Sequence, residues 1–148
     1  ALPHNLKRSL RLAPRVILQC PFQQRVELGM EDYVLDNLKQ YRHRYGDQGT
    51  EMFGDQLLHN LQRIHKRLGG AQYQRLSLLL IQAVKCVLEK DRIDGFVPII
   101  EELLTNYYDP MYTYQQRFHD GEVVFTGNFE EVKNWCKGMK NTENATQV

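Results

Sequence analysis

Long apolar runs are absent from this sequence. No stretch of about 18 apolar residues, the minimum for a membrane-spanning helix, occurs in it, and no secretory signal pattern is present. The three cysteines, Cys20, Cys86 and Cys136, are odd in number and too far apart for a Cys-x-x-Cys metal site or a disulfide framework. These absences predict a cytoplasmic protein in a reducing compartment, without a membrane partner.

The short motifs that carry phosphate, metal or hydrolytic chemistry are also missing. Neither Gly-x-x-x-x-Gly-Lys-[Ser/Thr] nor Gly-x-Gly-x-x-Gly occurs, and Gly69-Gly70 is followed by neither Lys-Ser nor Lys-Thr. His59 and His65 do not share a helix face as a pair of metal ligands four residues apart would. No nucleophile elbow is present. We therefore predict no catalytic residue, no metal ligand and no cofactor bound by this segment.

Charge is nearly balanced over the chain but unevenly distributed along it. The 148 residues carry a formal net charge of +1, and 42% of them are hydrophobic, which is enough for the core of one domain. Residues 1–75 hold 12 Lys and Arg against 7 Asp and Glu, whereas residues 76–148 hold 7 against 11. An anionic partner is therefore expected to bind the first half.

The N-terminal segment predicts one buried strand between two helices. Apolar spacing indicates a helix over residues 2–13, and Arg15 to Cys20 is a short β-branched apolar run between prolines. A strand flanked by helices is typical of a parallel α/β sheet, whose ligands bind just past the strand ends. Arg25 lies in that segment and is a candidate ligand-binding cation; alternatively, it pairs with Glu27 or Glu31.

The remaining pattern is predominantly helical. The chain begins Ala-Leu-Pro and its strand resembles an interior strand of a larger sheet, so we expect a piece of a longer protein. A loop is expected at residues 46–49, and the helix over residues 71–90 is expected to be the central, best-buried one. Helices are predicted over residues 23–43, 50–68, 71–90, 94–107 and 128–139, a second short strand over 122–126, and a disordered tail over 141–148.

Two basic segments are candidates for contact with a nucleic acid. Arg63, Lys66 and Arg67 lie on or near the face opposite the predicted buried stripe of their helix, and form the densest positive patch. Residues 39–45 alternate basic and aromatic side chains, a pattern that suits unpaired RNA. The alternative is an ordinary solvated surface in both cases: charged faces usually serve solubility, and the basic residues of 39–45 stabilise a helix C-terminus.

The most unusual stretch runs from Tyr107 to Gln115, with four tyrosines, an acid, a proline and an amide in nine residues. Proline fixes its own φ and disfavours helical geometry in the residue before it, so Asp109-Pro110 predicts a turn with the tyrosines leaving in different directions. Such a segment either anchors a core or builds a binding site.

This stretch, followed by Val123 to Gly127, resembles the end of the bacterial tRNA 2-selenouridine synthase family, also called tRNA selenotransferase. The resemblance covers about residues 1–140. Further matching pieces occur in the same order, namely Leu2-Pro3, Pro21-Phe22, Arg25-Val26-Glu27, Tyr33, Tyr45-Gly46-Asp47, Lys66-Arg67-Leu68-Gly69 and Tyr73.

The resemblance implies an enzyme with a rhodanese-like domain, which carries a catalytic cysteine, followed by a P-loop domain. That family acts on wobble 2-thiouridine of tRNA, first adding a geranyl group from geranyl diphosphate and then replacing the geranylthio group with selenium from selenophosphate. Residues 1–140 resemble the C-terminal part of its P-loop NTPase-like domain. The cysteine and phosphate loop are then expected upstream of Ala1, and this segment is not expected to be active alone.

The resemblance also assigns expected roles to residues of this chain. Arg63, Lys66 and Arg67 are expected to contact the tRNA backbone. The expected substrate-binding residues are Arg25, Tyr108, Asp109, Tyr112, Tyr114 and Gln115. The alternative to a substrate-binding wall is a non-catalytic helical interaction module or an inactive truncated remnant.

Overall fold

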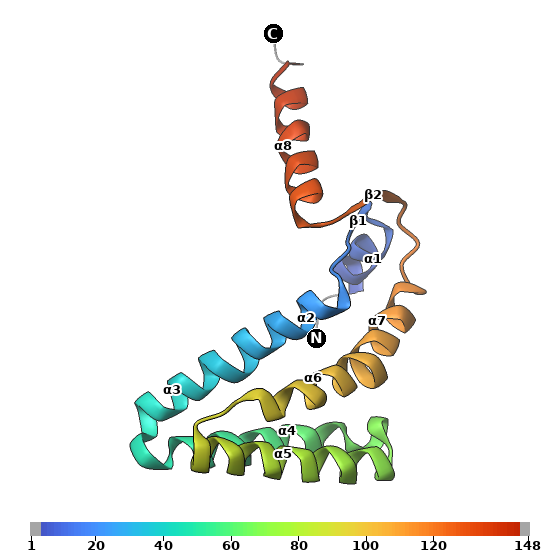
Figure 1. Cartoon of the computed structure of the whole chain (residues 1–148). Helices are drawn as coiled ribbons and strands as arrows, with labels where there is room; N and C mark the ends of the chain where they lie inside the picture. Colours follow the sequence, from blue (N-terminus) through green and yellow to red (C-terminus); the bar gives the residue numbers. More distant parts are fainter. Residues whose placement is uncertain (1–3, 146–148) are drawn as a thin grey trace. The chain divides into compact units, whose positions relative to one another are not determined.

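The structure, a computed structural model, describes residues 4–145 and divides into two compact units. We call residues 22–112 the helical unit, and the segments before and after them, residues 1–21 and 113–148, the sheet unit. Helix predominates, and the described strands form a two-stranded parallel sheet (Figure 1). The prediction of a mostly helical α/β chain with two short strands is confirmed.

The sheet unit is built on strands far apart in the sequence. β1 pairs in parallel with β2 from Arg15 opposite Val123 to Leu18 opposite Gly127, with an irregularity between Arg15 and Val16. Two described helices and the last residues of a third accompany the strands. The elements are α1 (His4–Leu12), β1 (Arg15–Leu18), the end of α7 (Asp109–Gln116), β2 (Val123–Gly127) and α8 (Phe129–Ala145).

A close backbone contact at Gly121 joins the end of α1 to the segment that leads into β2. The backbone N–H groups of Asp120 and Gly121 donate to the carbonyl of Arg11, and the Arg11 guanidinium pairs with the Asp120 carboxylate at 2.7 Å. A Cβ at Gly121 would lie 1.9 Å from the Ala13 carbonyl oxygen. Only glycine therefore permits this close approach of the backbones.

The last helix begins as the sequence predicts and ends later. Asn128 and Glu131 form a capping box: the Asn128 N–H donates to Glu131 Oε2 at 2.7 Å, and the Glu131 N–H donates to Asn128 Oδ1 at 3.0 Å. α8 extends to Ala145, into the segment 141–148 that the sequence predicts to be a disordered tail, and no proline or glycine interrupts the helix there. The rest of that tail lies outside the described residues.

The helical unit consists of a long first helix, a helical hairpin and a returning helix. Two π-helical segments, η1 and η4, lie within the first and the returning helix. The elements are α2 (Phe22–Leu28), η1 (Gly29–Leu35), α3 (Asp36–Tyr45), η2 (Gly46–Gln48), α4 (Gly49–Leu68), α5 (Gly70–Lys90), η3 (Asp94–Phe96), α6 (Val97–Leu103), η4 (Leu104–Tyr108) and the start of α7 (Asp109–Gln116).

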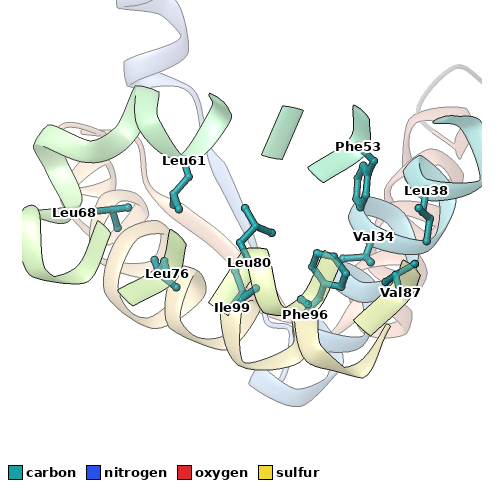
Figure 2. Packing of buried hydrophobic residues seen from close by; sticks show 11 residues of the cluster. Val34, Leu38, Phe53, Leu61, Leu68, Leu76, Leu80, Val87, Phe96 and Ile99 are labelled. Carbon is teal, nitrogen blue, oxygen red and sulfur yellow. The ribbon is translucent and has the colours of Figure 1, made fainter. Parts of the chain in front are cut away.

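One hydrophobic core holds these helices together. Side chains from α4 meet those from α5 and η3, and Leu76 and Phe96 are among the most deeply buried (Figure 2). The sequence predicts that α5 is the best-buried helix. Only the face of α5 that packs on the core is buried, because Leu78, Ile81 and Leu88 are about half exposed. The buried residues of this core are Val34, Leu38, Phe53, Leu61, Leu68, Leu76, Leu80, Ala83, Val87, Phe96 and Ile99.

The expected loop at residues 46–49 is shorter than predicted. Residues 46–48 form a 3-10 turn, and α4 begins at Gly49. Thr50 is buried and accepts a hydrogen bond from Arg42 Nε at 3.0 Å. A Cβ at Gly49 would lie 2.6 Å from the Tyr41 carbonyl oxygen, so this glycine lets α4 start directly against α3.

The predicted turn at Asp109-Pro110 is wrong. Asp109 has helical backbone angles, and the π-helical segment η4 leads directly into α7. Pro110 lies in the first turn of α7, where the absence of a backbone N–H costs little hydrogen bonding. The wide π turn before it accommodates the proline ring. Tyr108 and Tyr112 consequently lie one turn apart, with their rings 6.4 Å apart between centroids.

Candidate functional site

A single cleft in the helical unit collects most of the predicted site residues. It has a volume of about 840 Å³ and lies among α2 and η1, α4, and the helix that runs from α6 through η4 into α7. Polar groups from all three sides border it, including Arg25, Arg63, Arg67, Tyr108 and Asp109. Its apolar lining comes chiefly from Leu28, Leu57, Leu61, Ile64, Leu80, Phe96, Ile99, Ile100, Leu103 and Leu104.

Arg25 and Asp109 form a two-pronged ion pair at this cleft. Arg25 Nη1 donates to Asp109 Oδ1, and Arg25 Nη2 donates to Asp109 Oδ2 at 3.0 Å. The Arg25 guanidinium carbon also lies 5.5 Å from the centroid of the Phe22 ring. The pair joins α2 to the first residue of α7, and about a third of each side chain is exposed. The anionic group that Arg25 meets in the structure is thus Asp109.

Four tyrosines gather at the same cleft, and we call them the tyrosine cluster: Tyr33, Tyr107, Tyr108 and Tyr112. The rings of Tyr107 and Tyr108 meet edge to face, with centroids 5.0 Å apart, and those of Tyr108 and Tyr112 are nearly parallel, at 21°. Burial raises the pKa of Tyr108 above its ordinary value of 10.0, and the nearby phenols of Tyr107, Tyr33 and Tyr112 raise it further. Tyr108 therefore stays a neutral phenol at physiological pH.

The cationic side of the cleft comes from α4. Arg63 and Arg67 lie one turn apart on that helix and both line the cleft. Arg67 Nη1 donates a long hydrogen bond of 3.4 Å to the hydroxyl of Tyr107. Two guanidinium groups beside an apolar lining suit a ligand with an anionic head.

Some predicted residues lie elsewhere. Lys66 does not line the cleft, although it shares α4 with the two arginines. Tyr114 and Gln115 belong to the sheet unit, where the Tyr114 ring meets Phe118 edge to face at 5.0 Å. The structure therefore brings together Arg25, Tyr108, Asp109 and Tyr112, and it adds Arg63 and Arg67 to them.

Four polar residues of the cleft were not predicted as site residues from the sequence: Asp32, Tyr33, Asn60 and Tyr107. Tyr33 shares the helical spacing of Val26 and Met30, which indicates a buried face, yet it is 73% exposed. The wide turns of η1 alter the helical register at this position. Both π-helical segments, η1 and η4, contribute to the lining, and π turns often occur at functional sites.

The basic and aromatic end of α3 lines a smaller hollow of about 440 Å³. Two of its cations bind acids of the same chain: Arg42 Nη2 donates to Asp91 Oδ1 at 2.8 Å, and Lys39 pairs with Asp36 at 3.4 Å. These pairs favour the interpretation of residues 39–45 as an ordinary helix end.

Neither a metal cluster nor a membrane-spanning helix is found in the part of the chain that the structure describes. Among the side chains that the structure describes, no three from His, Cys, Asp or Glu are grouped so that they could hold a metal ion. In the same residues, no helix combines the length and the apolar character needed to cross a bilayer. What the described site offers is an apolar cleft bordered by arginines, tyrosines and two carboxylates.

Comparison with known proteins places residues 1–143 in a described family, the tRNA 2-selenouridine synthase AAA domain. Proteins named tRNA 2-selenouridine synthase are similar over most of the chain. The protein of Marinobacter nauticus is 38% identical over 96% of this chain, that of Pseudomonas fluorescens 35% over 89%, and that of Salmonella enteritidis 34% over 93%.

The similarity covers only part of each relative. The chain spans 39%, 36% and 38% of the length of these three proteins, respectively. No solved structure matches the chain significantly.

Proposed function

This chain belongs to the tRNA 2-selenouridine synthase AAA domain family, and from that premise we propose that it forms one wall of the substrate site of such an enzyme. The enzyme converts wobble 2-thiouridine of tRNA to 2-selenouridine, by geranylation of the sulfur with geranyl diphosphate and then exchange for selenium from selenophosphate. Catalytic groups, including the rhodanese cysteine and the phosphate loop, come from other parts of the enzyme. The segment itself supplies binding contacts.

The single observation that carries this proposal is the composition of the cleft. Its apolar lining suits the geranyl chain, and Arg63 and Arg67 are permanent cations that suit phosphate groups. Tyr108 and Tyr112 offer aromatic faces to an unpaired base. A cleft with apolar, cationic and aromatic parts fits a reaction that joins a prenyl diphosphate to an RNA base.

Contacts with the tRNA backbone are assigned to α4. Arg63 and Arg67 meet phosphates at the cleft, and Lys66 meets a neighbouring phosphate from the same helix. Tyr114 and Gln115 contribute substrate contacts from the sheet unit.

Residues 1–140 form, in this proposal, the C-terminal part of a P-loop NTPase-like domain. The sheet supports this, because parallel strands are normally covered on both faces. Here Val16, Leu18, Val123 and Val124 are between 38% and 52% exposed. Strands and helices from the preceding part of the domain would cover them.

The reading frame upstream of Ala1 tests the domain proposal directly. We expect it to continue in frame and to encode a rhodanese-like domain with a cysteine, followed by Gly-x-x-x-x-Gly-Lys-[Ser/Thr]. A frame that starts close to Ala1 would contradict the proposal and favour a non-catalytic helical interaction module or an inactive remnant.

Substitutions at the cleft test the substrate wall. Arg67→Gln and Arg63→Gln in the full-length gene product should each weaken tRNA binding and reduce the slope of log affinity against log salt by about one. Lys85→Gln is the matched control, because Lys85 is exposed on α5 and outside the cleft. A salt slope unchanged by both arginine substitutions would contradict the phosphate contacts.

A second pair of variants tests the apolar lining. Leu104→Gln, within the cleft, should weaken binding of geranyl diphosphate measured by calorimetry. Leu78→Gln places the same change on the exposed face of α5 and should leave binding unaltered. Equal affinities in the two variants would show that the prenyl chain binds elsewhere.

A further inference from the structure

The tyrosine cluster contains more aromatic surface than packing requires. Tyr33 is 73% exposed, Tyr112 54% and Tyr108 38%, so these rings are not buried as core anchors. Three of the four come from the π-helical segments η1 and η4, and the fourth follows one turn later. A group of phenols held beside an apolar cleft presents electron-rich ring faces to whatever binds there.

Charged side chains of both signs line the same cleft as the tyrosine cluster. The charged residues that line the cleft are three arginines and two aspartates. Arg25 and Asp109 neutralise each other in their two-pronged pair, and Arg67 donates to the hydroxyl of Tyr107 at 3.4 Å. An anion is therefore attracted towards Arg63 and Arg67 on α4, whereas a cation is favoured near the rings and the carboxylate of Asp32.

This separation matches the charges that develop in an allylic substitution. The C–O bond between the allylic carbon and the diphosphate breaks, and its electron pair leaves with the diphosphate. The sulfur at position 2 of the base forms the new C–S bond, while the N3 proton of the base passes to the departing diphosphate. Positive charge accumulates on the allylic carbon before the C–S bond is complete.

We propose that the tyrosine cluster stabilises the allylic cation that develops during geranyl transfer, with Tyr33, Tyr108 and Tyr112 as catalytic residues that face the reacting carbon. The inference rests on the function proposed above. Aromatic faces attract cations, and a contact of this kind is worth about two- to fivefold in rate at an exposed site and up to about thirtyfold once bound substrate has excluded water. The hydrocarbon chain then lies along the apolar lining and the diphosphate lies towards Arg63 and Arg67.

Paired substitutions test this role. In the full-length gene product, Tyr112→Phe and Tyr33→Phe should keep the rate of geranyl transfer within about threefold, because the ring face remains. Tyr112→Leu and Tyr33→Leu should lower that rate by about tenfold or more, with little change in the affinity for geranyl diphosphate.

The outcomes separate this inference from the function it rests on. Leucine variants with unchanged geranyl transfer, or phenylalanine variants as slow as the leucine ones, would overturn the cation-stabilising role and leave the substrate wall intact. Failure of the proposed function would instead appear as an affinity for geranyl diphosphate that is unchanged by Leu104→Gln, Arg63→Gln and Arg67→Gln.

A fluorinated series keeps the test valid where a leucine variant is poorly folded. Phenylalanine carrying one, two or three ring fluorines at position 112 preserves shape while withdrawing electron density from the face. Each added fluorine should lower the logarithm of the transfer rate by a similar step. A rate independent of fluorination would contradict the proposal.

Discussion

The helical unit and the sheet unit hold their elements together in different ways. In residues 22–112 a continuous core of buried side chains joins the helices, and Leu76 is fully buried. In the sheet unit, the joints between described elements are chiefly backbone hydrogen bonds and a close contact at Gly121, while Leu10 and Leu18 remain half exposed. One unit is stabilised mainly by hydrophobic burial, and the other mainly by local backbone geometry.

The largest expected effect lies in the core of the helical unit. Phe96→Ala should lower the free energy of unfolding by about 3–5 kcal/mol, because it removes a buried ring and leaves a cavity. Leu10→Ala, at a half-exposed position of α1, should cost less than about 1 kcal/mol. Urea unfolding followed by circular dichroism measures both. If both variants lost a similar free energy of unfolding, the two units would not differ in how much they depend on hydrophobic burial.

Gly121 should be the most sensitive position of the sheet unit. Gly121→Ala places a Cβ against the Ala13 carbonyl and should cost about 3 kcal/mol, with faster amide exchange in β1 and β2. Gly138→Ala is the matched control, since nothing lies within 4 Å of a Cβ there, and it should stabilise α8 slightly. Hydrogen exchange read by mass spectrometry resolves the two. Unchanged exchange in Gly121→Ala would show that the backbones can separate without cost.

The Arg25–Asp109 pair should have an intermediate effect within the helical unit. Asp109→Asn should lower the free energy of unfolding by about 1–2 kcal/mol, because each side chain is only about a third exposed and Arg25 loses its charged partner. A double-mutant cycle with Arg25→Gln measures the coupling. A coupling near zero would mean that the pair does not hold α2 against α7.

The smallest expected effect is a pH dependence at Tyr108. Its pKa is raised in the folded chain, so its contribution to stability is complete below about pH 10 and is lost as the pH rises through the higher folded pKa. Thermal melting between pH 9 and pH 11.5 should therefore fall less steeply in Tyr108→Phe than in the unsubstituted chain. If the melting temperatures of the two proteins fell equally steeply with pH, the loss of stability at alkaline pH would come from the other tyrosines.

The helices, the two strands and the capping box of α8 were accessible from the sequence because they depend on local patterns. Asn128 and Glu131 are three residues apart, and their hydrogen bonds form wherever a helix begins. The helical register at Tyr33 and the backbone conformation at Asp109 could not be predicted from the sequence. The π turns there alter the helical spacing, and no characteristic residue composition marks such turns. Local preference for a turn at Asp109-Pro110 was overridden by packing within the helical unit.

The sequence by itself determined the family, the predominance of helix, and the residue types of the candidate site, because these follow from periodicity and from residues in a fixed order. Only the tertiary structure decided that Arg25 binds Asp109 across 84 positions of sequence, that Arg63 and Arg67 share a cleft with the tyrosines, and that Tyr114 and Gln115 belong to another unit. The reason is physical: side chains distant in sequence meet only when helices pack, and no local pattern encodes which faces will meet.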